Sequence, residues 1–224
     1  MNTILSSMNR ILFAFSVFFV LSVSSCQSEV QREDIQNNAE SYFFKFFNAQ
    51  EQAAILAIKA TFDKGINRDF EWDDISRAYD YHAKTIRIDL LNGVPFTLTY
   101  PYDGTFDFQN YTAELNQLPF ITNECGFQNA ETKQKINYYC LNLEQRYFDY
   151  LQELSKSSSF IANFAEAYQK SKSLTPTIKE KLLFSAKEEL DFMNLDHQQL
   201  YMWLHLLASE EIMAMHKYKQ LPKW

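Results

Sequence analysis

The chain has 224 residues and a formal net charge of −7, and it contains only four glycines and five prolines. The acidic balance argues against nucleic acid as a partner, because binding to phosphates requires a basic surface. It argues equally against electrostatic adhesion to anionic lipid. The scarcity of glycine and proline argues against a β-sandwich or barrel, whose many turns need these residues. We therefore expect a mainly α protein.

The amino terminus predicts an export signal. Arg10 precedes an apolar run from Ile11 to Leu21, and small residues follow. A positive start, an apolar run of about 7–15 residues and a small-residue exit are typical of a secretory signal. The run is shorter than the roughly 20 apolar residues that a membrane-spanning helix needs. The exit, Val23-Ser24-Ser25-Cys26, resembles the bacterial lipobox of an aliphatic residue, two small residues and cysteine.

The lipobox resemblance implies that Cys26 carries lipid. In lipobox proteins the thiol takes a diacylglycerol, the chain is cut before the cysteine, and the new amino terminus is usually acylated. Two or three acyl chains give stable anchoring. We therefore expect a signal peptide over residues 1–25, a polar tether over 26–38 and a single helical domain over 39–224. The alternative is an ordinary secretory signal in which the cysteine is coincidental.

The lipid anchor predicts a location in the cell envelope. No aspartate directly follows Cys26, so the inner-membrane retention cue familiar from enteric bacteria is absent. This favours the outer membrane and leaves open whether the domain faces the periplasm or the outside.

Helical periodicity starts directly after the tether. One continuous pattern runs from Asp34 to about Asp63, and Gly65 is a natural C-terminal stop. A second helix is expected from Asp69 or Trp72 to Leu91.

Residues 94–127 break this rhythm. Phe96, Leu98 and Tyr100 alternate, and Asp103-Gly104 follows. An Asp-Gly pair flanked by alternating apolar residues is typical of a hairpin. We expect a small β-hairpin or irregular insertion around residues 94–127.

Four helical segments follow this insertion. One is expected from about Asn129 to Ser155, a short one starts near Phe160, and Thr175-Pro176 opens another, with threonine as the cap. A kink or a restart is expected at Asn194 to Asp196, since aspartate caps well, and the last helix ends at about Lys219. The fold class is therefore an antiparallel bundle of about five or six helices with one excursion.

The aromatic segment around the insertion is the candidate partner-binding site, since aromatic side chains dominate interface hot spots. Alternatively, the same residues cap the open end of the bundle. The candidate residues are Phe96, Tyr100, Tyr102, Phe106, Phe108 and Tyr111.

Cys125 and Cys140 are the two cysteines that follow Cys26. An even pair in an oxidising compartment predicts a disulfide. Two buried free thiols are the alternative.

The four histidines do not form a recognisable metal motif. Neither a glutamate three residues before a histidine nor an HExxH sequence occurs among His82, His197, His205 and His216. His82 lies on an apolar helix stripe and is expected to be a hydrogen-bonded core residue. No GxSxG turn occurs either. We expect no cofactor, no metal and no catalytic residue.

These patterns favour a lipid-anchored, non-enzymatic accessory or partner-binding protein of the cell envelope. Its partners would be the membrane, through the anchor, and an unidentified envelope protein. An immunity or inhibitor lipoprotein is a second hypothesis, since an acidic face can steer onto a basic toxin. A hydrolase that uses Cys125 or paired carboxylates is the third.

Overall fold

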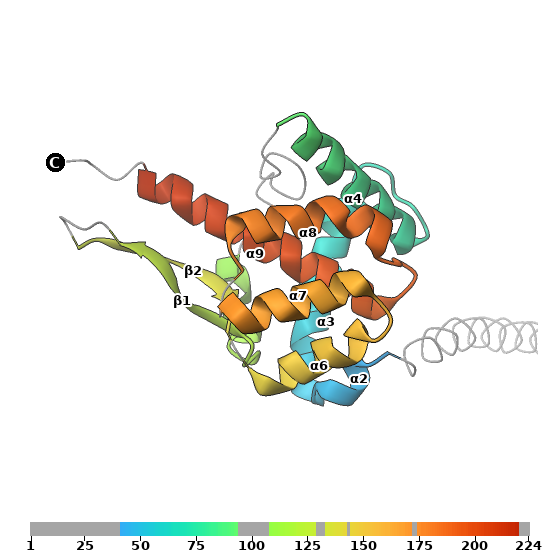
Figure 1. Cartoon of the computed structure of the whole chain (residues 1–224), viewed down its shortest axis with the longest axis horizontal. Helices are drawn as coiled ribbons and strands as arrows, with labels where there is room; N and C mark the ends of the chain where they lie inside the picture. The colour runs from blue at the N-terminus through green and yellow to red at the C-terminus, as the bar shows by residue number, and fades with distance from the viewer. Residues whose placement is uncertain (1–40, 94–107, 129–132, 143, 172–173, 220–224) are drawn as a thin grey trace, which may run out of the picture. The chain divides into compact units, whose positions relative to one another are not determined.

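The structure of the protein is a computed structural model. It describes residues 41–93, 108–128, 133–142, 144–171 and 174–219 (Figure 1). The chain divides into two units, Met1–Ser41 and Tyr42–Trp224, and every helix and strand described below belongs to the second. Cys26, the expected signal peptide and the expected tether lie outside the described residues.

The protein is mainly α with one small antiparallel hairpin, which confirms the expected fold class. The observed strands lie between Ile121 and Leu141, whereas the expected turn at Asp103-Gly104 lies outside the described residues. Two single-turn helices, α2 (Phe43–Phe46) and α5 (Thr112–Leu115), and the 3-10 helix η2 (Phe108–Tyr111) are short. Among the described residues, six helices have eleven residues or more: α3 (Ala49–Ile66), α4 (Ile75–Leu91), α6 (Gln145–Ser155), α7 (Ser159–Ser171), α8 (Pro176–Glu189) and α9 (Leu195–Lys219).

Helix α9 forms the centre of the core. Every side chain from Asp196 to Ser209 is buried, and a helix without a solvated face must be covered on all sides. It packs against α3, α8 and both strands of the hairpin (Figure 1). This part of α9 therefore forms the centre of the core, while α4 packs mainly on α8 and α6 on α7.

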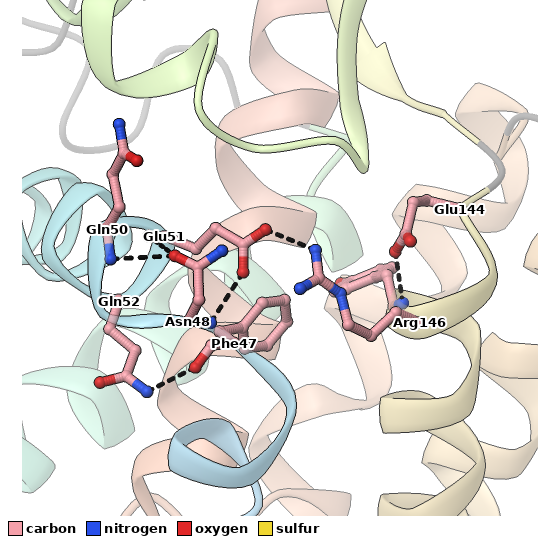
Figure 2. Close-up of polar contacts among 8 residues, drawn as sticks. Phe47, Asn48, Gln50, Glu51, Gln52, Glu144 and Arg146 are labelled. Atoms are coloured by element: carbon pink, nitrogen blue, oxygen red, sulfur yellow. Dashed lines mark hydrogen bonds and ion pairs between the residues drawn. The ribbon is translucent and has the colours of Figure 1, made fainter.

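The helix expected from Asp34 to Asp63 is interrupted within the described residues, because α2 and α3 are separated at Phe47 and Asn48. The cause is a capping box. The Asn48 side chain accepts hydrogen bonds from the backbone N–H groups of Gln50 and Glu51, at 2.9 and 3.0 Å, and the Asn48 N–H donates to Glu51 Oε2 at 2.8 Å (Figure 2). These bonds satisfy backbone groups that a helix start leaves unpaired.

Glu51 also connects α3 to α6. Its second carboxylate oxygen accepts a hydrogen bond from the Arg146 guanidinium (Figure 2). The Glu51 side chain is buried, whereas Arg146 is partly exposed. Glu144 caps α6 by accepting from the Tyr147 N–H at 2.7 Å. The starts of the two helices are thereby fastened to each other.

The hairpin consists of β1 (Ile121–Gln128) and β2 (Lys135–Leu141). The helix expected from Asn129 is therefore wrong in its first half, and helix resumes only at Gln145. Ile136 and Cys140 are four residues apart, which fits a helix stripe, but Ile136, Tyr138 and Cys140 also alternate as in a strand. The segment forms a strand because it pairs with β1.

A disulfide joins the two strands, as the cysteine count predicted. Cys125 and Cys140 are bonded, with their Cα atoms 6.1 Å apart. An irregularity in the register lies between Thr122 and Cys125. A side chain at Gly126 would place its Cβ 2.7 Å from the Ile136 carbonyl oxygen, so the strands approach too closely there for any other residue to fit without a shift.

The last helix restarts where expected, but with a different cap. Asn194 Oδ1 accepts from the backbone N–H groups of Asp196 and His197, at 2.8 and 3.4 Å. The Asp196 carboxylate instead accepts from the N–H groups of Tyr42 and Phe43, at 3.1 and 3.0 Å. The predicted capping role of Asp196 is therefore wrong, because Asn194 already fills that position and Asp196 points into the core.

Candidate functional site

Three aromatic side chains form a cluster at the surface where α3 passes into α4. The rings of Phe70 and Trp72 are stacked, with centroids 4.6 Å apart, and the Tyr81 ring meets Phe70 edge-on at 4.6 Å. Phe70 is 45% exposed and Tyr81 44% exposed. The three rings therefore support one another and still present apolar faces to solvent, and exposed apolar patches can mark binding sites.

The connection that carries Phe70 and Trp72 is held by Asn67. Its side chain accepts from the Trp72 N–H and donates to the Trp72 carbonyl, both at 2.8 Å. Glu71, between the two aromatic residues, has a φ of 46°. A left-handed conformation at a residue other than glycine costs about 1–3 kcal/mol and is concentrated at functional sites. The loop is therefore a fixed, strained support for the exposed rings.

The cluster borders an open groove of about 480 Å³, lined by α4 and by the connection between α8 and α9. Helices α4 and α8 lie side by side (Figure 1). Met193, which is 75% exposed, lines the same groove as Trp72 and Tyr81. We call Phe70, Trp72, Tyr81 and Met193 the aromatic surface.

Charged side chains of both signs line the groove. Lys187 and Asp80 form an ion pair of 2.6 Å that joins α8 to α4. Arg77 lies over the Trp72 ring, 5.6 Å from its centroid. Within the described part of the chain, Arg77 and Lys84 have no ion-pair partner. Asp191 also lines the groove, so Arg77, Lys84 and Lys187 against Asp80 and Asp191 leave the lining with one net positive charge, on a chain whose net charge is −7.

The sequence analysis missed the aromatic surface because it expected the second helix to begin at Asp69 or Trp72, which would place Trp72 within the helix. The helix starts later, at Ile75, where the side chain of Asp74 accepts from the Ser76 N–H. Trp72 thus lies in the preceding connection and is only half-buried. The available signal was the cap Asp74, two residues after Trp72, which places Phe70 and Trp72 outside the helix.

The six aromatic residues that the sequence predicted as the partner-binding site do not lie on the aromatic surface wherever the structure describes them. Phe96, Tyr100, Tyr102 and Phe106 lie outside the described residues. Phe108 is buried and stacks on Tyr139, with centroids 5.3 Å apart. Tyr111 is partly buried, and its hydroxyl donates to the Thr61 hydroxyl.

Phe108 therefore contributes to the core and is not accessible to a partner. This agrees with the alternative hypothesis, in which these aromatic residues cap the open end of the bundle. For the four residues outside the described ranges, partner binding stays a prediction.

His82 is a hydrogen-bonded core residue, as expected. Its Nδ1 lies 2.7 Å from the Tyr201 hydroxyl, and its ring centroid is 4.8 Å from that of His205. Burial lowers the pKa of His205 well below its usual value, and the neighbouring His82 lowers it further. Both rings are buried in an aromatic environment, so this pair has a structural role.

Across the described ranges, no three His, Cys, Asp or Glu side chains converge as a metal site would require. None of the helices in these ranges combines the length and the apolar character needed to cross a bilayer. Comparison of the chain with models of known families, with characterised proteins and with solved structures gave no match.

Proposed function

We propose that the chain is a lipid-anchored accessory protein of the cell envelope that binds a partner protein through the aromatic surface. The observation that carries the proposal is the fixed, exposed cluster of Phe70, Trp72 and Tyr81 beside a groove. Interface cores are enriched in Tyr, Trp, Phe, Met and Arg, and Met193 and Arg77 supply the last two.

The charges favour an acidic partner that is not a second copy of this chain. Arg77 and Lys84 outnumber the one acidic lining residue outside the Lys187–Asp80 pair, Asp191, and complementary charges steer association and exclude wrong partners. Two copies of a chain with a net charge of −7 repel each other at long range. The expected partner therefore presents an apolar patch rimmed by carboxylates.

Two further observations support a place in the envelope. The sequence Val23-Ser24-Ser25-Cys26 resembles a lipobox. The disulfide between Cys125 and Cys140 fits an oxidising compartment, where such bonds persist. A lipid anchor would hold the domain at a membrane. Its effective concentration near another envelope protein would then be higher than in free solution, which favours an accessory role.

Site-specific photo-crosslinking tests the partner. A photoreactive amino acid is placed at Tyr81, and for comparison at Leu56 on α3, which is similarly exposed at 39% and does not line the groove. We expect one envelope protein to be crosslinked from Tyr81 and not from Leu56. Equal crosslinking from both positions, or none from Tyr81, would contradict the proposal.

Purified proteins then test the chemistry. Phe70→Ser and Tyr81→Ser are each expected to weaken binding at least about tenfold, as hot-spot truncations do, whereas Leu56→Ser leaves it unchanged. Arg77→Gln is expected to reduce the association rate and its dependence on salt. If the affinity is the same for all four variants, the aromatic surface is not the interface.

Metabolic labelling tests the anchor separately. Cells given a clickable fatty acid are expected to label the wild-type protein and not Cys26→Ala. An unlabelled wild type would show that the chain is not a lipoprotein, and the partner experiment would still stand.

A further inference from the structure

A second, smaller cavity lies between the hairpin, α8 and α9. Its volume is about 150 Å³. The walls are mostly apolar, and the disulfide forms part of them. The apolar lining comprises Leu141, Phe164, Leu174, Trp203, Leu204 and Leu207. An engineered cavity of about 150 Å³ with such a lining binds benzene, so this one is large enough for a single aromatic ring.

The cavity also has one strongly polar wall. Lys179 of α8 donates to Glu211 Oε2 of α9 at 2.5 Å, and both side chains are buried, with 7% and 9% exposed. The Tyr138 hydroxyl of β2 donates to the other oxygen of Glu211 at 3.2 Å. Burial and the neighbouring Glu211 raise the pKa of Tyr138 to about 12, so the phenol stays protonated and keeps donating.

Lys179 has hydrogen-bonding capacity left over. An ammonium group has three N–H donors, and within the described residues its hydrogen-bond partner is Glu211 alone. Unsatisfied donors of a buried charge are costly. Because Lys179 lines the cavity, an acceptor bound there would satisfy one of these donors.

The charge balance decides what kind of acceptor fits. Lys179 and Glu211 already neutralise each other, so a carboxylate ligand would add an uncompensated negative charge to a buried site, and an amine would add a positive one. We propose that this cavity binds a small, uncharged, largely apolar molecule that places one hydrogen-bond acceptor at Lys179 Nζ. The exposed Thr175 and the half-buried Cys125 at its wall give it access to solvent.

Three probes of equal ring size test this assignment. Benzyl alcohol carries a ring and a neutral hydroxyl, whose oxygen can accept from Lys179, toluene lacks the hydroxyl, and benzoate replaces it with a charged carboxylate. Titration of the purified oxidised protein by calorimetry, with methyl NMR of Leu204 and Leu207, is expected to show benzyl alcohol binding about tenfold tighter than toluene. Benzoate is expected to bind most weakly.

Two variants locate the site. Leu207→Phe fills the cavity and is expected to abolish binding of benzyl alcohol, whereas Leu56→Phe on the surface of α3 leaves it unchanged. Lys179→Met is expected to remove the preference for benzyl alcohol over toluene while toluene binding persists, a readout that a merely destabilised protein would not give. Thermal unfolding of each variant verifies that it is folded.

Several results would overturn the proposal. Binding of benzoate more tightly than benzyl alcohol would make this an anion site. No binding of any probe at millimolar concentration would mean that water alone occupies the cavity. Binding that survives Leu207→Phe in a folded protein would place the ligand elsewhere.

Discussion

The Tyr201 hydroxyl lies 2.7 Å from Nδ1 of His82, and this contact joins α9 to α4 across 119 positions of sequence. Both residues are buried. Tyr201→Phe removes the hydroxyl and leaves the ring in place, so we expect a loss of about 1–3 kcal/mol in the free energy of unfolding. Urea unfolding followed by far-UV circular dichroism measures it. Tyr81→Phe, which changes an exposed tyrosine, is the matched control, and an equal loss in both variants would contradict the prediction.

Acidification is expected to destabilise the protein from about pH 6.5 downward. Burial keeps the pKa of His205 well below its usual value and also lowers that of His197. Near pH 6.5 and below, these two histidines are protonated in the unfolded chain but remain neutral in the folded state. The free energy of unfolding therefore falls as the pH decreases below that value. Above it, this contribution is constant.

The free energy of unfolding at pH 8 and at pH 5, measured in wild type and in His205→Gln, tests this account. The variant is expected to lose less stability between the two pH values, because glutamine does not titrate. His197→Asn is expected to show a partial effect. Identical pH dependence in all three proteins would show that these histidines are not responsible.

Removal of the disulfide is expected to lower stability by about 3 kcal/mol. Cys125 and Cys140 are separated by 15 residues, and a crosslink over a loop of that length restricts the unfolded chain by about this amount. The urea midpoint of Cys125→Ala/Cys140→Ala should match that of wild type treated with dithiothreitol. The reductant should not affect the double variant, and any shift there would point to a different target.

The capping box of α3 predicts a smaller effect. Asn48→Ala removes the acceptor for two backbone N–H groups and is expected to cost about 1 kcal/mol. Gln50→Ala, in the same first turn, changes an exposed side chain and serves as the control. If both changes have the same effect on the urea midpoint, the cap is not the source of stability at this end.

Some elements could be predicted because their signals are local. Thr175-Pro176 does open α8, and the Thr175 hydroxyl accepts from the Ile178 N–H at 3.4 Å. His82 lies between Tyr79 and Ile86 on a buried stripe, and the spacing alone identified it as a core residue. In each case a few neighbouring residues carry all the information needed.

Other elements could not be predicted because they depend on partners far away in the sequence. Ile136 and Cys140 fit a helix and a strand equally well until β1 pairs with them. The cap at Asn48 had a local signature, Glu51 three residues later, but apolar residues at helical spacing on both sides of it, such as Phe47 before and Ile55 after, concealed the break. The ion pair of Lys179 with Glu211 joins two separate helices, and no spacing rule connects them.

The intrinsic fluorescence of the tryptophans can report on both sites of the protein. Trp203 is buried, packs edge-on against Phe120 and lines the cavity beside the disulfide, whereas Trp72 is half-buried beside the groove. The third tryptophan of the chain is Trp224. An indole shielded from water emits at shorter wavelength than a hydrated one. In the Trp224→Phe variant the emission of Trp203 and that of Trp72 can therefore be separated. A change in the blue component then reports events in the cavity, and a change in the red component reports events on the aromatic surface, in a single sample without an added label.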